Sequence, residues 1–497
     1  MSGEQSRAGG ARRSFSLAVA VFAATAALAI AGLRPEPTSA EPKVAPNVVV
    51  IMTDDQTSSD MRFLPKTQRL IGRKGVAFNR FYTSDPLCCP SRATYLTGQY
   101  AHNHRVLSNT GSTGGYKRLD KQHTLANWLQ DSYRTAWVGK FLNGYGAGGA
   151  DDKKEIPPGW DRWYVPPSSS GIKMYDYTLN QNGSLRRYGS KPSHYQTDVY
   201  ARLATQFIGA ASEGVEPFFL TISPLAPHDD RKTNEAGRGV HGPEPAPRHR
   251  DRFRSLRFPK KPSFDEANVS DKPRYVRHRR RLTAADVSKF TESYRRRGRS
   301  LLAVDDLVQK VVGKLADTGQ LGNTYIFFTS DNGYLLGEHR LETKSYPYEE
   351  SVRVPLLVRG PQIPAGGTRS QIVANVDLAP TILEVAGMAQ DDPAYGHPLD
   401  GVSLLPVARF NSSPALPAAP ARRGILLESF SLSHYQGVES DGWSYVKYRS
   451  GEKELYNLGR DRYQLKSRAK SAGSRGRRDS MQNLLGKLDE CDGAGCS

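Results

Sequence analysis

Short apolar runs alternate with polar, glycine-containing stretches along the chain from residue 46 onward. The first run, Asn-Val-Val-Val-Ile-Met at 47–52, has the continuous apolar character of strands that are buried on both faces of a parallel sheet. Similar runs stand at 135–138, 217–222, 325–329 and 354–358. The pattern therefore predicts that these segments are the core strands of one sheet.

Helical spacing appears between the strands. It is clearest at 301–312, where apolar residues recur at the spacing of one helix face. Alternating strands and helices indicate an α/β fold, a layered sheet with helices on both faces. In such a fold, polar residues at the carboxyl ends of the strands are the first place to look for a functional site.

Changes in composition divide the rest of the chain. The stretch 159–289 is rich in Gly, Pro, Ser, Tyr and Arg, which predicts long loops over one face of the sheet. A Pro/Ala linker at 414–420 precedes a tail with strand-like runs. We therefore predict a large domain at 46–410 and a small C-terminal α+β domain with an antiparallel sheet at 421–497.

Residues 1–40 have the pattern of an export signal. Arg12 and Arg13 precede an apolar stretch at 17–33, and a small-residue cleavage site follows near Ala40. The Arg pair resembles a twin-arginine signal; an ordinary secretory signal and an uncleaved anchor are the alternatives. We expect an exported bacterial protein, secreted or associated with the cell envelope, with no stable membrane span after signal cleavage.

The chain is strongly basic, with a formal net charge of +19, and its basic residues crowd between Arg248 and Arg299. Such a run is most often a solvated face; the alternatives are a surface for an anionic polymer or substrate, and a nucleic-acid surface. No zinc-finger, helix-turn-helix or RNA-binding motif accompanies it, so we expect no nucleic-acid partner.

The cysteines fall into two pairs. Cys491 and Cys496, near the end of the chain, predict a disulfide in an oxidising compartment. Cys88 and Cys89 are adjacent, and a bridge between neighbouring residues is strained. The ordinary interpretation of Cys88 is then a buried structural thiol, and the alternative is a reactive residue.

The residues around Cys88 favour the reactive alternative. The run from Cys88 to Gly98 reads Cys-Cys-Pro-Ser-Arg-Ala-Thr-Tyr-Leu-Thr-Gly. It resembles the signature of the sulfatases, in which the first Cys is oxidised to formylglycine and becomes the nucleophile. Pro90 predicts that a helix begins directly after Cys88, and a helix N-terminus offers N–H groups and a positive field to an anion.

Paired carboxylates follow two of the predicted strands. Asp54 and Asp55 come directly after the first strand, and Asp331 and Asn332 come directly after the strand at 325–329. Oxygen ligands of this kind suit a hard cation, and no His/Cys set suggests zinc. The resemblance to sulfatases implies that Asp54, Asp55, Asp331 and Asn332 hold the cation together with residue 88. We expect Ca²⁺, with Mg²⁺ as the second choice.

The resemblance also assigns roles to charged side chains at other strand ends. Arg92, Lys140 and Lys344 match positions that contact the nucleophile or the sulfate group, and His228 is the candidate proton donor to the leaving alcohol. One position departs from the family pattern: many sulfatases have a His where this chain has Leu142. Asn143, His102 and His104 are the possible replacements.

A branch of the family is closer still. Gly-Lys-Phe-Leu-Asn at 139–143, Ala-His-Asn-His at 101–104 and the run 354–361 resemble N-acetylglucosamine-6-sulfatase. The resemblance implies an alkaline-phosphatase-like fold, with 46–410 as the catalytic domain. It also implies hydrolysis of a sulfate monoester on a small molecule or glycan such as glucosamine 6-sulfate, and a formylglycine-generating enzyme that modifies Cys88. The alternatives are a phosphonate or phosphate ester hydrolase of the same superfamily and a non-catalytic glycan-binding relative.

Overall fold

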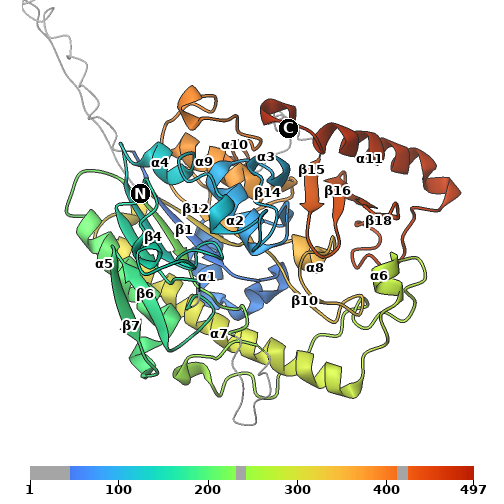
Figure 1. The fold of residues 1–497 in the computed structure, drawn as a ribbon, viewed down its shortest axis with the longest axis horizontal. Coiled ribbons are helices and arrows are strands. Elements are labelled where there is room, and N and C mark those ends of the chain that lie inside the picture. The colour runs from blue at the N-terminus through green and yellow to red at the C-terminus, as the bar shows by residue number, and fades with distance from the viewer. Residues whose placement is uncertain (1–44, 169, 231–241, 411–423, 497) are drawn as a thin grey trace, which may run out of the picture. The chain divides into compact units, whose positions relative to one another are not determined.

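The computed structural model describes residues 45–168, 170–230, 242–410 and 424–496 (Figure 1). The predicted signal at 1–40 and the Pro/Ala linker at 414–420 lie outside the described residues, and the division into two domains stays a prediction. Within the described residues, no helix is both long enough and apolar enough to cross a membrane.

The central sheet has ten strands in the order β13-β2-β12-β9-β1-β8-β4-β5-β6-β7 (Figure 1). Their bounds are Gly367–Arg369 (β13), Val76–Phe78 (β2), Leu356–Arg359 (β12), Thr324–Ser330 (β9), Asn47–Thr53 (β1), Phe218–Ser223 (β8), Arg134–Gly139 (β4), Arg162–Val165 (β5), Tyr177–Gln181 (β6) and Ser184–Tyr188 (β7). The strands that the apolar runs predict are adjacent in the centre of this sheet, from β12 to β4. The predicted α/β sheet is confirmed.

The strands β9, β1, β8 and β4 are mutually parallel, so their carboxyl ends share one edge. In the register, Val49 of β1 pairs with Ile326 of β9 on one side and with Leu220 of β8 on the other. The strand β12 pairs antiparallel with β9. Its apolar run does not reveal this orientation, because a buried strand needs the same side chains in either direction.

Each face of the sheet is covered by its own hydrophobic core. Alternate residues of β1 point to opposite faces: Val48 and Val50 belong to one buried cluster, and Val49 and Ile51 belong to the other. The first cluster includes residues of α2, α4 and α9, and the second includes residues of α5 and α7. A strand that is apolar at every position is therefore required here, as its sequence predicts.

The helices are mostly short, apart from α5, α7 and α11. Their bounds are Pro65–Leu70 (α1), Cys88–Thr97 (α2), Ala101–His104 (α3), Leu125–Leu129 (α4), Gln196–Ala211 (α5), Arg274–Arg277 (α6), Ala284–Asp317 (α7), Glu349–Val352 (α8), Leu378–Val385 (α9), Leu405–Arg409 (α10) and Arg475–Leu488 (α11). Thr283 caps α7: its hydroxyl accepts a hydrogen bond from the N–H of Asp286, and the carboxylate of Asp286 accepts one from the N–H of Thr283.

Two expectations need correction. The segment 159–289 is not only loop, because it contains β5, β6, β7 and α5 besides the predicted β8. The strand β7 lies at the edge of the sheet and is exposed at most positions, so it lacks the apolar signal of the central strands. Helix α7 extends well beyond the predicted 301–312, into a basic stretch whose polar residues hide the periodicity.

A separate four-stranded antiparallel sheet lies at the C-terminal end, as predicted. Its strands are Ile425–Ser429 (β15), Tyr435–Ser440 (β16), Trp443–Tyr448 (β17) and Lys453–Asn457 (β18), and α11 packs on it. Shorter pairs are formed by Leu335–Leu336 (β10) with Glu342–Thr343 (β11), and by Phe81–Tyr82 (β3) with Val373–Ala374 (β14). The predicted disulfide between Cys491 and Cys496 is present.

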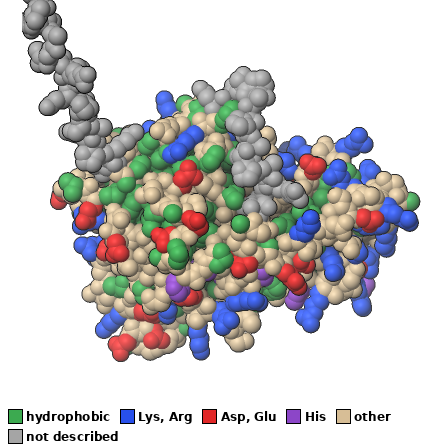
Figure 2. Space-filling view, turned by 90° about the horizontal axis from the view of Figure 1, so that it is seen from above, with side chains coloured by type: hydrophobic (Ala, Val, Ile, Leu, Met, Phe, Trp, Pro, Cys, Tyr) green, Lys and Arg blue, Asp and Glu red, His purple; other side chains and the backbone are tan. Residues whose placement is uncertain are grey.

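The basic surface is interspersed with acids. Figure 2 shows Lys and Arg side chains spread over one face of the molecule among Asp and Glu. Within the basic stretch, Arg248 pairs with Asp198 at 2.6 Å, and Arg280 pairs with Asp286 at 2.7 Å. These pairs fit a solvated, locally neutralised face for much of the stretch.

Candidate active site

Side chains converge at the shared carboxyl edge of the parallel strands. Asp54 and Asp55 follow β1, Asp331 and Asn332 follow β9, and Lys140 follows β4. His228 lies a few residues beyond the end of β8. The edge predicted from the sequence is therefore the place where these residues meet.

Cys88 is the first residue of α2 and is 1% exposed. Its Sγ lies 2.9 Å from Nζ of Lys344, 3.4 Å from Nζ of Lys140 and 3.7 Å from Oδ1 of Asp54. Cys88 is at the N-terminus of α2, so the positive end of the helix dipole lies beside the sulfur, while the N–H of Cys89 donates to Asn109 Oδ1 at 2.9 Å. Two ammonium groups and a helix N-terminus thus surround the Cys88 side chain.

The Cys88 thiol is not activated by these cations. Burial raises its pKa to about 11, more than Lys140 and Lys344 lower it. At neutral pH, residue 88 therefore carries a neutral thiol, which is a poor nucleophile.

The carboxylates are held in the ionised form. Burial opposes ionisation of Asp54 and Asp55, but Lys140 beside Asp54 and Lys344 beside Asp55 outweigh it and keep the pKa of each below its usual range. Each lysine forms an ion pair with its carboxylate, and Asp54 and Asp55 are almost fully buried. Desolvation strengthens these pairs, because water does not compete for the charges.

Arg92 cross-links the two carboxylate-bearing strand ends. It is completely buried, and its Nε donates to Asp331 Oδ2 at 2.9 Å while Nη2 lies 3.4 Å from Asp54 Oδ2. Its Nη1 donates to the Lys140 carbonyl at 2.8 Å and to Ser223 Oγ at 2.7 Å. Arg92 thereby ties the ends of β1, β9, β4 and β8 together, which its place in the sequence motif alone does not reveal.

The loop geometry after β1 and β9 is constrained. Asp55 has φ of 67°, in the left-handed region, and its N–H donates to Asp331 Oδ1 at 3.1 Å. Gly333 follows Asn332 where a Cβ would lie 2.1 Å from the carbonyl oxygen of Glu350, so only glycine fits there. These contacts fix the relative positions of the two carboxylate pairs.

Arg297 of α7 is a site residue that the sequence does not single out. It is 3% exposed; its guanidinium donates to the carbonyl of Asp55 and lies 3.3 Å from the carbonyl oxygen of Pro227, the residue before His228. It also packs over the ring of Tyr334 at 5.1 Å. Arg297 belongs to the Arg295-Arg296-Arg297 run, whose composition predicts a solvated face, and no local signal separates it from its neighbours.

Family comparison identifies this arrangement. The sequence profile described as "Sulfatase" matches residues 46–388. This chain belongs to the sulfatase family. A second profile, described as "N-sulphoglucosamine sulphohydrolase, C-terminal", matches residues 337–490.

Individual relatives agree with the family. The chain is 39% identical to human N-acetylglucosamine-6-sulfatase over 375 residues, which covers 73% of this chain and 64% of the human protein. It is 36% identical to the extracellular sulfatase SULF-1 homolog of Drosophila melanogaster, over 73% of this chain and 31% of that protein. The chain thus spans less than two thirds of the length of these curated relatives. The predicted resemblance to the N-acetylglucosamine-6-sulfatase branch is confirmed.

Solved structures share the fold. A structure in complex with its substrate D-glucosamine-2-N,6-O-disulfate superposes with a TM-score of 0.74 at 24% identity, covering 90% of this chain and 98% of that one. The phosphonate monoester hydrolase of Agrobacterium radiobacter superposes with a TM-score of 0.66 at 20% identity, covering 88% and 94%. At these identities the likeness establishes the alkaline-phosphatase-like fold alone.

The donor groups of this sulfatase fit a divalent cation. Ligand atoms of Asp54, Asp55, Cys88 and His228 all lie within 4.8 Å of one another. Oδ1 of Asn332 is buried and accepts no hydrogen bond from the described residues, while its Nδ2 donates to Asp55 Oδ1 at 2.6 Å. A buried amide oxygen without a hydrogen-bond donor, beside two carboxylates, provides the oxygen ligands that a hard cation prefers. Asp331 lies beside this group, but its oxygens accept from Arg92, Asp55 and Asn332.

His228 lies at the rim of this cluster. Its Nε2 is 3.7 Å from Asp55 Oδ2, and its Nδ1 lies 2.6 Å from the carbonyl oxygen of Asp229. A carbonyl only accepts, so Nδ1 carries a proton and Nε2 faces the site. Burial lowers the pKa of His228 more than Asp55 and Asp54 raise it.

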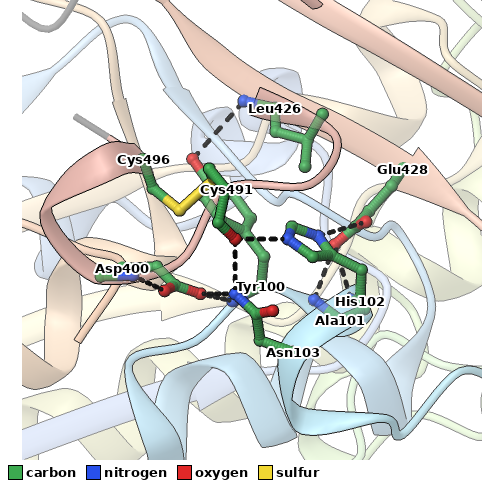
Figure 3. Close-up of a disulfide and its surroundings, with 10 residues drawn as sticks. Tyr100, Ala101, His102, Asn103, Asp400, Leu426, Glu428, Cys491 and Cys496 are labelled. Carbon is green, nitrogen blue, oxygen red and sulfur yellow. Dashed lines mark hydrogen bonds and ion pairs between the residues drawn. A yellow bond between two sulfur atoms is a disulfide. The ribbon is translucent and has the colours of Figure 1, made fainter. Parts of the chain in front are cut away.

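Among the described residues, the imidazoles named as possible replacements for the one absent at position 142 are bonded to other groups. His102 contacts Glu428 and the carbonyl of Cys491, as Figure 3 shows, and His104 bonds to Thr94 Oγ1 at 3.0 Å. Leu142 is buried in the core. Asn143 bonds through its backbone, its N–H reaching Cys89 Sγ at 3.1 Å. These contacts hold both histidines to groups other than Cys88, so they lend no support to a role for either at the site, which stays a prediction.

Proposed function

We propose that this chain is a sulfuric ester hydrolase that cleaves a sulfate monoester on a sulfated carbohydrate such as glucosamine 6-sulfate. The observation that carries the proposal is the convergence of Lys344, Lys140 and Asp54 on the Sγ of Cys88, at the N-terminus of α2. Family membership and the activity for which the human relative is named support the same reaction.

Residue 88 acts after oxidation to formylglycine. The neutral, buried thiol described above is unsuited to attack sulfur, and the Cys-Cys-Pro-Ser-Arg context fits the modification. When modified, residue 88 supplies an aldehyde hydrate whose hydroxyl can attack the sulfate ester. Because Cys88 is 1% exposed in the folded chain, a formylglycine-generating enzyme has to reach it before folding is complete.

A divalent cation, Ca²⁺ in preference to Mg²⁺, would be held by Asp54, Asp55, Asp331, Asn332 and residue 88. The buried acceptor of Asn332 and the ionised carboxylates support this set. When bound, the cation would supply Lewis-acid stabilisation of the sulfate oxygens and of the nucleophile. Asp331 also orients Arg92, because its Oδ2 accepts from Nε of Arg92 while its Oδ1 is held by the N–H of Asn332.

The cationic side chains bind and neutralise the sulfate group. Lys140 and Lys344 keep their charges because Asp54 and Asp55 raise their pKa values despite burial. Both ammonium groups are rotatable donors that contact residue 88, so they can follow the sulfate oxygens. Arg92 adds a third positive charge, which Asp331 and Asp54 hold in place. His228 presents Nε2 to the site and, once protonated, donates a proton to the leaving alcohol.

The exported location is part of the proposal. The predicted signal at 1–40, the disulfide and the extracellular sulfatase among the relatives support export, and the resemblance to a twin-arginine signal supports secretion or cell-envelope attachment in a bacterium. The shared fold of the phosphonate monoester hydrolase makes a phosphonate or phosphate ester hydrolase the second candidate.

One experiment tests the nucleophile. Trypsin releases residues 81–92, and formylglycine makes this peptide about 18 Da lighter than the thiol form. We expect the lighter peptide in protein from a host with a formylglycine-generating enzyme, and loss of activity in Cys88→Ala. Cys89→Ala is the matched control, because it removes the adjacent buried thiol and leaves the peptide modifiable.

Substrate class needs a separate comparison. N-acetylglucosamine 6-sulfate and an aryl sulfate should be hydrolysed with a higher kcat/KM than the matching phosphate esters. A thiol at residue 88 in fully active protein would rule out the mechanism, and a preference for phosphonate or phosphate esters would favour the second candidate. Removal of Ca²⁺ with a chelator should abolish turnover, and addition of Ca²⁺ should restore more of it than Mg²⁺.

A further inference from the structure

A second cleft lies at the same edge of the central sheet as the active site. It has a volume of about 480 Å³ and is bounded by the loop after β1, the segment after β2, helix α8 and the turn that follows β18. This volume falls within the range of small-ligand sites. The residues that give it chemical character are Arg80, Lys261, Glu349, Glu350, Arg353 and Arg462.

Sheet topology places this cleft beside the candidate active site. The strand β12 is antiparallel to both β9 and β2, so β2 is parallel to β9 and β1, and their carboxyl ends share one edge. Arg80 lies just beyond the end of β2, and Arg353 lies just before β12. Ser58, three residues beyond Asp55, lines the cleft and donates from Oγ to the carbonyl of Arg353 at 3.2 Å.

Charge pairing leaves part of the lining positive. Lys261 pairs with Glu350 at 3.1 Å and with Glu338 at 3.2 Å, and Arg353 pairs with Glu349 at 2.7 Å. Among the described residues, neither Arg80 nor Arg462 has a carboxylate within ion-pair distance. Burial raises the pKa of Glu349 and outweighs Arg353 and Arg80, which both act to lower it.

Arg80 carries the most specific signal. Its Nη2 is buried from solvent and makes no hydrogen bond with any described residue. An unpaired buried N–H costs free energy, Arg80 as a whole is half-buried and lines the cleft, and a planar guanidinium matches the paired oxygens of a sulfate or carboxylate group. Arg462 also lines the cleft, from the C-terminal segment, where it donates to the hydroxyl of Tyr463 at 2.8 Å.

We propose that this cleft is a second anion-binding subsite, in which Arg80 and Arg462 bind a sulfate or carboxylate group of a saccharide chain. Tyr463 offers aromatic surface to the sugar ring, and the hydroxyls of Thr57 and Ser58 offer hydrogen bonds. The proposal rests on the proposed function for the saccharide class of its ligand. It gives the C-terminal segment a role in binding a chain longer than one sugar.

The test separates binding from turnover. Cys88→Ala protein is titrated calorimetrically with a heparin-derived tetrasaccharide and, in a second arm, with inorganic sulfate. Arg80→Gln and Arg462→Gln are each introduced, with Arg73→Gln as the matched control. Arg73 is an exposed cation just before the start of β2, at the opposite edge of the sheet. Circular dichroism melts verify folding, and Arg462→Gln, at an exposed residue, keeps the test decisive if the half-buried Arg80 is needed for stability.

We expect each cleft variant to weaken tetrasaccharide binding about 10-fold, as loss of one charge-assisted contact would. Arg73→Gln should change the tetrasaccharide affinity less than 2-fold. In protein that retains Cys88, the cleft variants should leave kcat/KM on the monosaccharide sulfate unaffected.

Equal tetrasaccharide affinities for cleft and control variants would overturn the proposal. Inorganic sulfate binding that depends on Arg80 and Arg462, without such dependence for the tetrasaccharide, would overturn the saccharide assignment. Failure of the proposed function would instead appear as absent turnover of the monosaccharide by unsubstituted protein.

Discussion

Ser433 Oγ donates a hydrogen bond to the carbonyl of Ser345, the residue that follows Lys344. Ser433 lies between β15 and β16 of the C-terminal sheet, whereas Lys344 contacts Cys88. Thr343 and Ser345 both have positive φ, at 89° and 69°, so the segment that carries Lys344 needs support from its surroundings. The N–H of Ser345 supplies a second tie, to the carbonyl of Pro86 at 3.1 Å.

Removal of the Ser433 hydroxyl should loosen Lys344. We expect Ser433→Ala to lower kcat/KM on a sulfate ester by about 10-fold, because one partly buried hydrogen bond contributes about 1 kcal/mol and Lys344 would lose its orientation. Ser433→Thr, which keeps the hydroxyl, should restore most of the activity. Ser431→Ala is the matched control, since that hydroxyl contacts Ser429 Oγ at the end of β15, at 3.3 Å, and no described residue of the active site. Steady-state kinetics give the answer, and equal effects of Ser433→Ala and Ser431→Ala would contradict the prediction.

Arg297 should matter to both loops that it contacts. Arg297→Met removes the donors to the carbonyls of Asp55 and Pro227 and leaves Asp60 without its buried partner at 3.3 Å. We expect kcat to fall about 100-fold or more and the Ca²⁺ concentration for half-maximal activity to rise, as with partners that orient metal ligands.

Two further variants separate support of the loops from charge alone. Arg297→Lys keeps the charge but cannot reach both carbonyls, so it should recover little activity. Arg295→Met is the control from the same basic run, because Arg295 donates to the carbonyl of Leu256 at the surface. Activity and Ca²⁺ titrations that are the same for Arg297→Met and Arg295→Met would show that the Asp55 loop supports itself.

The difference between Arg297 and Asp54 explains how far the sequence predicts the site. Asp54 stands directly after an apolar strand, so the alternation of strands and helices is enough to place it at the carboxyl edge of the sheet. Arg297 reaches the same site from the middle of α7, and only tertiary packing turns one of three adjacent arginines inward. Local pattern predicts what a strand end carries, but not which distant helix supports it.

The fold follows the same division. Central strands such as β1 are apolar at every position because both faces are buried, so the sequence predicts them well. The edge strand β7 contains Arg186 and Arg187 and is largely exposed, so nothing in its composition distinguishes it from a loop. Ser433 is in the same position, because its importance depends on a contact with a residue that lies far away in the sequence.

A buried ion pair predicts a pH-dependent stability. His102 Nδ1 lies 3.0 Å from Glu428 Oε2, and Nε2 lies 2.9 Å from the carbonyl oxygen of Cys491, so both ring nitrogens donate (Figure 3). Burial opposes the charged imidazole, but Glu428 outweighs it and raises the pKa of His102 to about 9. A folded pKa above the unfolded value of about 6.5 means that the stabilisation is complete below pH 6.5 and is lost as the pH rises through about 9.

Replacement of His102 should remove that dependence. We expect His102→Gln to lower the free energy of unfolding by about 2 kcal/mol at pH 6 and by much less at pH 9.5, since the charge-assisted bonds are present only at the lower pH. Urea titrations at the two pH values measure the difference. His123→Gln is the control, because His123 pairs with Asp120 at the surface. A deficit for His102→Gln that is the same at both pH values would mean that the imidazole is neutral in the folded protein.

The disulfide between Cys491 and Cys496 should stabilise the chain without affecting catalysis. The carbonyl of Cys491 accepts from His102 and from Asn103, and the N–H of Gly493 donates to Asp400 at 2.8 Å, so the disulfide loop is tied to α3 and to the segment before α10 (Figure 3). Closing so short a loop contributes about 2 kcal/mol in the chain-entropy account.

We expect the double variant Cys491→Ser/Cys496→Ser to melt at a lower temperature than the unsubstituted protein, and reduction of the unsubstituted protein to lower its melting temperature in the same way. The value of kcat/KM should stay within about 2-fold, because the loop contacts α3 and not Cys88. The double variant also provides the control, since reductant should no longer change its melting temperature. A large loss of kcat/KM at a temperature where the double variant is fully folded would instead connect this loop to the site, through α3 and the end of α2.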